Sequence, residues 1–343
     1  MKKITKMLLG LLASSTFLAA CGNTGSSDNT TADSGEANKT LYFIPIVDIG
    51  AYWNPMRKGA EDTAKKLGYD LVVKTSPPAE AQKNEKHIGF VNEAVSNKAA
   101  GIAIAPIEAN MFKAPIKAAM DANIPVITFD ADLENPEDRT AYVGTDNVLA
   151  GRDLGMKAAE ELKEKGITSG SISVVCVDRA QPTMIAREKG LKEGFNEVMG
   201  DDAANFKFLE TIQDKDQAAV SKEQLEGQIT GNDDLVLVFS LGSEGPDVGV
   251  MEALAAQNKA GEILHFGFDY TPTWEKGIED GRITAIVDQD AYNIGVQVIE
   301  NLVKAIDGEE LEDNIPIDVK FVRAEELVEY GKEKQKQSTD TTE

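Results

Sequence analysis

Two aspartates stand directly after apolar runs in this chain of 343 residues, in positions that suggest chemistry. Asp130 ends the run PVITFD, and Asp269 ends LHFGFD, just before an aromatic residue and a turn. Tyr52 and Trp53 come shortly after the first apolar run. Loops at the carboxyl ends of strands line the ligand crevice of open α/β sheets. We therefore expect these four side chains at such a crevice, where a carboxylate either caps a turn or offers a charged acceptor.

The elements that would place these residues follow from a repeated pattern. Apolar runs begin near residues 41, 69, 101 and 125 and, after a break, near residues 171, 206, 235 and 262, with helical stretches between them. This repeat is typical of the βαβ unit of a parallel sheet that is covered on both faces. The two series predict an α/β fold with two doubly wound parallel-sheet lobes.

The stretch NPMRKGAEDTAKKLG predicts the first helix. Asn54 can cap it, Pro55 suits its first position, and Gly68 can end it. This assignment leaves Tyr52 and Trp53 in the loop before the helix. The face expected to pack on the sheet carries Met56, Ala60, Ala64 and Leu67.

Two more strands, at 283–289 and 316–322, are predicted after both series are complete, with a helix at 293–308 between them. A chain that returns after its second lobe crosses back to the first. We therefore expect several hinge strands and a clamp of two closing lobes.

The N-terminus is typical of a secreted lipoprotein. Lys2, Lys3 and Lys6 precede an apolar segment of 14 residues, which is too short to span a bilayer comfortably. That segment ends in LAAC, which resembles a lipobox, so residues 1–20 are predicted to be a signal peptide and Cys21 the lipidation site. Residues 21–39 are predicted to be a flexible tether and 331–343 a disordered tail, because both are polar.

Charge and motifs exclude several functions. The net charge of −23 argues against nucleic-acid binding. The chain has no HExxH, P-loop, GxSxG or strand-linked GxGxxG motif, so we expect neither an enzyme nor a cofactor. DADLEN begins like a calcium loop but has Asn135 and Ala141 where Gly and Glu are needed, so no metal is expected. Cys176 is the only cysteine besides Cys21, so no disulfide is expected.

Several segments in order carry a family resemblance. They are NIPVITFD, the GTDN at 144–147, the AREKG at 186–190, and GFDYTPTWEKGIEDGRITAIVDQDAYNIG. With them the chain resembles, over residues 40 to 330, the type I solute-binding proteins of bacterial sugar ABC transporters, which bind ribose, galactose or arabinose.

The resemblance implies two Rossmann-like lobes joined by a three-strand hinge, with a monosaccharide in the cleft. The corresponding lobes are 40–143 plus 289–314 (the N-lobe) and 144–288 plus 315–330 (the C-lobe). It also implies a site: Tyr52 and Trp53 stack on the sugar, Arg187 donates to it, and the polar contacts are Asp130, Asp269, the hinge residue Gln289 and, with less support, Gln181. Aspartate acceptors, an arginine fork and aromatic faces suit a sugar's hydroxyls and C–H patches.

Simpler roles stay open for each of these residues. The aspartates could be caps, the aromatic pair core residues, Arg187 a solvated helix residue and Gln289 a strand-end polar residue; Trp274 is expected to pack on its helix. The pattern also departs from the ribose binders at four polar positions, which makes ribose doubtful. These positions hold Gly50, Ala105, Ala131 and either Gly242 or Ser243.

These observations predict a monomeric receptor, anchored by lipid to the outer face of the cytoplasmic membrane, that delivers a monosaccharide or related polyol to an ABC permease and ATPase. A sensory receptor, or a receptor for a furanosyl autoinducer, would use the same clamp. A LacI-like regulator would need a basic helix-turn-helix before residue 40, where the signal and the tether stand instead.

Overall fold

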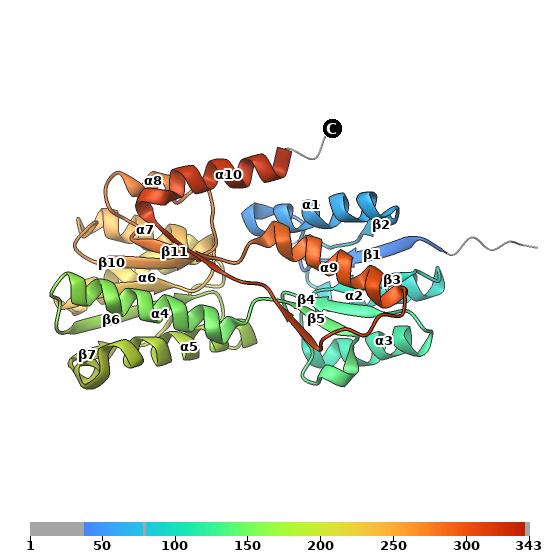
Figure 1. Ribbon diagram of the computed structural model, residues 1–343. Coiled ribbons are helices and arrows are strands. Elements are labelled where there is room, and N and C mark those ends of the chain that lie inside the picture. The colour runs from blue at the N-terminus through green and yellow to red at the C-terminus, as the bar shows by residue number, and fades with distance from the viewer. Residues whose placement is uncertain (1–37, 78–79, 340–343) are drawn as a thin grey trace, which may run out of the picture. The chain divides into compact units, whose positions relative to one another are not determined.

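The computed structural model of the chain describes residues 38–77 and 80–339. The predicted signal peptide, Cys21 and nearly all of the predicted tether lie outside these residues. The described chain is an α/β protein with two mostly parallel sheets, each at the centre of one lobe (Figure 1). No helix within this part of the chain is long and apolar enough to cross a membrane.

The N-lobe is built on a sheet whose neighbouring strands are all parallel. Its spatial order is β12 (Asn314–Pro316), β5 (Ala141–Gly144), β4 (Val126–Phe129), β3 (Gly101–Ile104), β1 (Thr40–Ile44) and β2 (Asp70–Val73). One core, lined by α1 (Gly50–Leu67) and α9 (Ala291–Ile306), covers one face of the sheet. A second core, with α2 (Lys83–Ser96) and α3 (Ala109–Asp121), covers the other face. The two covered faces explain why the central strands are continuous apolar runs.

The C-lobe repeats this plan with an added antiparallel edge. Its sheet runs β13 (Lys320–Arg323), β11 (Ala285–Asp288), β10 (Leu264–Phe268), β9 (Leu235–Ser240), β6 (Gly170–Cys176) and β7 (Phe206–Phe208), with β8 (Ile212–Gln213) also on β6. Only the pair of β11 and β13 is antiparallel among the described strands. The helices of this lobe are α4 (Asn147–Glu164), α5 (Pro182–Met199), α6 (Ala218–Gly231), α7 (Gly245–Ala256), α8 (Glu275–Ile278) and α10 (Leu327–Thr339).

The eight apolar runs of the two predicted series each form a strand, which confirms the two-lobed prediction. The chain passes between the lobes at three crossovers, which Figure 1 shows as separate connections: 145–146, 289–290 and 317–319. The third crossover corrects the prediction of one strand at 316–322. The run PIDVKFV instead forms parts of two strands, because Pro316 pairs with β5 of the N-lobe whereas residues 320–323 pair with β11 of the C-lobe.

The first helix begins earlier than predicted. It starts at Gly50, whose φ of 91° is readily adopted only by glycine, so the chain turns into the helix four residues before Asn54. Pro55 therefore lies inside the helix, and Tyr52 and Trp53 lie in its first turn and not in a loop. Gly68 ends the helix in the left-handed conformation, as predicted. Leu67 is 39% exposed, so its predicted packing on the sheet is wrong.

The predicted disordered tail is also partly wrong. Helix α10 continues through Thr339, and of the predicted tail only residues 340–343 lie outside the described chain. Its first turn is anchored by Leu327 and Tyr330, which are buried against the C-lobe. The apolar contacts of these two residues anchor the helix, although the sequence after residue 330 is polar and predicted no ordered structure.

A close helix pair stands against each sheet. In the C-lobe, a Cβ atom added to Gly190 of α5 would lie 1.9 Å from the main-chain oxygen of Val148 in α4. In the N-lobe, a Cβ added to Gly295 of α9 would lie 1.9 Å from the main-chain oxygen of Met56 in α1. Both helix pairs therefore depend on glycine for their approach, and both carry candidate site residues at their ends.

Candidate functional site

Asp130 and Asp269 follow the last residues of β4 and β10 and share an unusual backbone. Their φ angles are 61° and 60°, in the left-handed region that few non-glycine residues adopt. Such strain persists where the surrounding structure holds it, and it is common at binding sites. The turn directs each aspartate away from the strand at the carboxyl edge of its sheet, the edge that the sequence predicted.

Aromatic hydroxyls hold Asp130 in the N-lobe. Tyr52 donates through its hydroxyl to Asp130 Oδ1 over 2.7 Å, and Tyr142 donates to the main-chain oxygen of Asp130 over 3.2 Å. The ring of Trp53 meets the ring of Tyr52 edge-on, with centroids 5.3 Å apart. Both rings are only partly buried and pack against the N-lobe core. They keep part of their surface available to a ligand.

Burial decides the protonation of this pair. Burial, followed by the charges of Asp130 and Asp269, raises the pKa of Tyr52 well above its ordinary value, so the phenol stays a donor. Burial also raises the pKa of Asp130, against the hydrogen bond from Tyr52 and the positive charge of Arg187.

Arg187 is held rigidly at the C-lobe side of the site. It lies on α5 and is only 5% exposed. Its Nε donates to Asn147 Oδ1 and its Nη1 donates to the main-chain oxygen of Leu241, both over 2.8 Å. The guanidinium lies 4.2 Å from the centre of the Phe268 ring, in cation–π contact. These three contacts fix the plane of the fork before any ligand arrives.

Asp269 is more deeply buried than Asp130, with 5% exposure. Both of its carboxylate oxygens accept hydrogen bonds from Gln289 Nε2, over 2.8 and 2.9 Å. The indole of Trp274 donates to its main-chain oxygen over 2.8 Å. Burial raises the pKa of Asp269 to about 6, although the charge of Arg187 opposes this shift.

The six predicted site residues form one connected group: contacts join Tyr52 to Trp53 and Asp130, and Asp269 to Gln289, whereas Arg187 acts on both aspartates through its charge. Within it, the charge of Arg187 opposes the rise in pKa that burial gives to Asp130 in one lobe and to Asp269 in the other. The group combines two acceptors, a fixed donor fork and two partly exposed aromatic rings. Such a set recognises hydroxyls that both donate and accept, next to C–H surfaces.

Comparison with known proteins identifies the family. Residues 41–310, well over half of the chain, match the family described as periplasmic binding protein domain. The chain belongs to this family.

Several of its relatives and structural neighbours are named for sugars. The ribose import binding protein RbsB of Escherichia coli (strain K12) is 27% identical over 294 residues, which cover 85% of this chain and 93% of the relative. The D-allose-binding periplasmic protein of the same strain is 26% identical over 275 residues, 78% of this chain and 83% of the relative. An ABC transporter periplasmic solute binding protein from Actinobacillus succinogenes 130z, solved with bound D-allose, has a TM-score of 0.75 at 21% identity, covering 85% of this chain and 99% of that one. That last likeness shows the fold.

Two residues of this periplasmic binding protein's site were missed from the sequence. Asn147 orients Arg187 and begins α4, directly after Asp146, whose side chain caps that helix. The GTDN segment that contains both residues was a usable signal. Tyr142 holds the main-chain oxygen of Asp130, but it lies on β5, a strand that the apolar-run pattern did not reveal.

Gln181 stands apart from the connected group. It occupies the cap position before α5, is exposed, and its main-chain nitrogen donates to the oxygen of Asp178 over 3.1 Å. Its predicted ligand contact stays a prediction.

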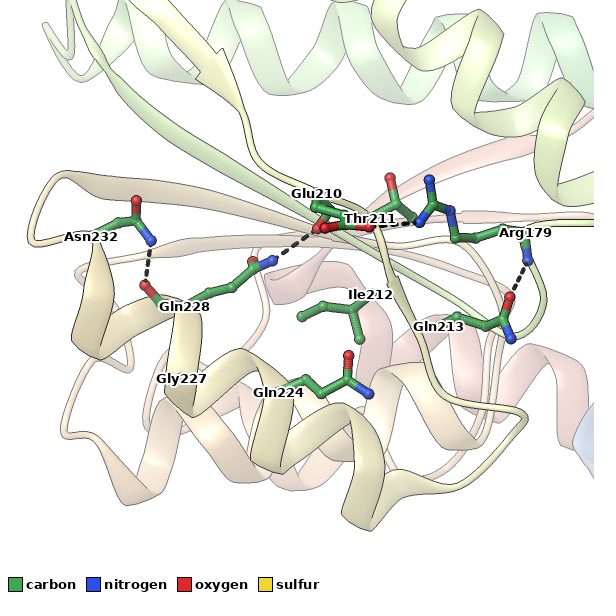
Figure 2. A pocket seen from close by; sticks show the side chains of 9 residues that line it. All are labelled: Arg179, Glu210, Thr211, Ile212, Gln213, Gln224, Gly227, Gln228 and Asn232. Carbon is green, nitrogen blue, oxygen red and sulfur yellow. Dashed lines mark hydrogen bonds and ion pairs between the residues drawn. The ribbon is translucent and has the colours of Figure 1, made fainter.

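The C-lobe of this binding protein also has an open surface hollow of about 650 Å³ beside β8 and α6 (Figure 2). None of the six site residues lines it. Figure 2 shows that its carboxamides are largely engaged within the lobe: Gln228 donates to the Glu210 main-chain oxygen, and Asn232 donates to that of Gln228. The first of these bonds ties the connection between β7 and β8 to α6, and the second closes the end of α6, so we assign the hollow a structural role.

Proposed function

We propose that this protein is an extracytoplasmic, lipid-anchored receptor that binds a neutral monosaccharide between its lobes and, as a monomer, delivers it to an ABC importer. The observation that carries the proposal is the pre-organised set of Asp130, Arg187 and Asp269 beside the rings of Tyr52 and Trp53. The names of the relatives support the same ligand class.

The ligand is proposed to differ from ribose. Four positions that are polar in ribose-type binders hold Gly50, Ala105, Ala131 and Gly242 or Ser243 here. Of these, Ala105 is fully buried and Gly50 is committed to the left-handed turn that starts α1. Such positions offer a ligand few side-chain hydrogen bonds, and hydroxyls left without partners in a closed site weaken binding.

A thermal-shift panel of pentoses, hexoses, deoxysugars, inositols, nucleosides and amino acids tests both statements. A ligand at a hundredfold excess over Kd stabilises the native state by ~2.7 kcal/mol. For lobes of this size we expect a rise in melting temperature of roughly 5 to 10 °C. A shift from amino acids or nucleosides alone would contradict the sugar assignment, and a largest shift from ribose would contradict the departure from ribose.

The anchor is tested separately. Mass spectrometry of protein from its native host should find diacylglycerol on Cys21, and Cys21→Ala should release the protein from membranes or leave it uncleaved. An unmodified Cys21 in native material would rule out the anchor without affecting the ligand proposal.

A further inference from the structure

The C-terminal helix α10 contacts the crossover that carries Gln289. Lys334 of α10 places its Nζ 2.8 Å from Asp288 Oδ2 and 2.8 Å from Asp290 Oδ1. The Lys334 side chain is only 17% exposed and that of Asp288 only 8%. One ammonium therefore binds the two carboxylates on either side of Gln289, in an environment where water competes weakly.

Tyr330 completes this attachment one turn earlier on α10. Its hydroxyl donates to Asp288 Oδ2, and the Lys334 ammonium lies 5.1 Å from the centre of its ring. The other oxygen of Asp288 accepts from the main-chain nitrogen of Tyr270 over 2.9 Å. Both carboxylate oxygens of Asp288 therefore have hydrogen-bond partners. They link the end of β11 to α10 on one side and to the turn after Asp269 on the other.

The attachment matters to the site because it engages the side chains directly before and after Gln289. Asp288 and Asp290 reach α10 while Gln289, between them, reaches Asp269 with its carboxamide. Asp290 also has a left-handed backbone, with φ of 51°, at the start of α9. The crossover therefore holds a strained turn whose conformation decides where Gln289 points.

We propose that Lys334 and Tyr330 are positioning residues of the ligand site, and that α10 holds the second crossover in the conformation that presents Gln289 to Asp269. This inference rests on the proposed function. The helix lies beyond residues 41–310, which match the family model.

Electrostatics gives α10 a second effect on the site. The charged groups around Asp269 are Arg187, which favours its ionised form, and Asp288, Asp130 and Asp247, which oppose it. Burial alone would raise the pKa of Asp288, but Lys334 and the Tyr330 hydroxyl reverse that shift, and the pKa of Asp288 is lowered. Without Lys334, the charge of Asp288 would act on Asp269 with less compensation and raise the pKa of Asp269 further.

The test compares Lys334→Met with Lys332→Met, an exposed lysine of the same helix. Calorimetry with the sugar that gives the largest thermal shift should show affinity reduced about tenfold by Lys334→Met at pH 7 and unchanged by Lys332→Met. The pH at which affinity is half lost should also move upward in Lys334→Met, and Lys334→Arg should restore both values. A purely structural lysine would not move that pH.

Wild-type affinity and an unshifted pH profile in folded Lys334→Met would overturn the proposal. If Lys334→Met does not fold, Tyr330→Phe decides: it keeps the ring, removes the hydroxyl bonded to Asp288, and should lower affinity roughly threefold. An unchanged Tyr330→Phe would then overturn the proposal.

If the wild-type protein binds no sugar, the proposed function fails, but the effect of Lys334 on the conformation of the second crossover can still be measured. Amide exchange at residues 286–292 should be faster in Lys334→Met than in Lys332→Met, and equal rates would overturn the positioning role.

Discussion

Each of the two lobes holds a carboxylate at the end of a strand, but the side chains that bind the carboxylate differ between the lobes. Asp130 and Asp269 each follow a phenylalanine that ends a strand, and each has a left-handed backbone. The main-chain oxygen of each accepts from an aromatic side chain, Tyr142 in one lobe and Trp274 in the other. The backbone part of the arrangement is therefore the same in both lobes.

The difference lies in what touches the carboxylates. Asp130 is partly exposed and accepts from Tyr52, a residue of the N-lobe that is itself expected to face the ligand. Asp269 is almost fully buried, accepts from Gln289 of a crossover and faces Arg187. Asp130 thus has its side-chain partner within its own lobe, whereas Asp269 has its partner on a crossover that joins the lobes. Their replacement should have unequal effects.

The largest expected effect is on ligand affinity. Asp269→Ala should weaken sugar binding by ~2–4 kcal/mol, since it leaves the buried Gln289 carboxamide without its partner and removes the negative charge that offsets the buried charge of Arg187. Asp130→Ala should cost only ~1 kcal/mol, because it strands a single neutral group, the Tyr52 hydroxyl, and no charge. Calorimetry, with circular dichroism to confirm the apo fold, measures both. Equal losses would show that the two carboxylates are equivalent. Arg187→Ala should cost as much as Asp269→Ala.

A second comparison concerns the glycine-packed helix pairs. Gly190→Ala and Gly295→Ala should each lower the free energy of unfolding by about 1–3 kcal/mol, because the added methyl meets a main-chain oxygen. Urea denaturation measures the change.

Gly89→Ala is the matched control for this comparison. Gly89 lies in the exposed part of α2, where an added Cβ meets nothing within 4 Å. Its replacement should be neutral or stabilise the protein by up to ~1 kcal/mol. A similar loss at all three glycines would mean that the close approach of the helices at Gly190 and Gly295 is not the cause of the destabilisation.

The smallest expected effect is the pH dependence of binding. The pKa of Asp269 is raised to about 6, so acidification from pH 7.5 to 5 protonates it and should weaken binding by up to about tenfold. In the ligand-free protein, the effect of pH on stability has the opposite sign to its effect on binding. The folded state holds this proton more tightly than the unfolded chain does. The contribution of Asp269 to stability is therefore lost as pH rises through about 6. Calorimetry and melting curves at several pH values separate the two. Asp269→Asn should flatten both profiles, and a profile unchanged by it would assign the titration to another group.

The fold was largely predictable because parallel strands covered on both faces leave continuous apolar runs, such as VITF before Asp130 and LHFGF before Asp269. Strand β5 was missed because its four residues follow β4 after a connection that holds only a short 3-10 helix, Pro136–Asp138, and no α-helix. The third crossover was missed because the apolar residues on both sides of it look like one alternating strand. A local pattern cannot show which sheet each half joins.

The site was predictable where a residue follows a strand or sits in a family segment, as Asp130, Arg187 and Asp269 do. The first residue of α1 was not predictable from the sequence. Asn54 and Pro55 are an equally good local start for a helix, and the turn at Gly50 depends on the backbone around it. The contact of Tyr330 with Asp288 joins residues 42 positions apart and leaves no local pattern at all.

The three crossovers have a consequence for how the chain acquires its structure as it leaves the ribosome or the secretion channel. The first part of the chain to emerge makes most of the N-lobe sheet. Two elements of this lobe arrive only after residue 290: helix α9, whose Gly295 packs on Met56 of α1, and the edge strand β12. The C-lobe in turn waits for β13 at residues 320–323. Neither lobe can close its core from one continuous stretch, so both should mature together in the final tenth or so of synthesis, and a chain cut at either of the first two crossovers should yield two unfolded fragments and not two working halves.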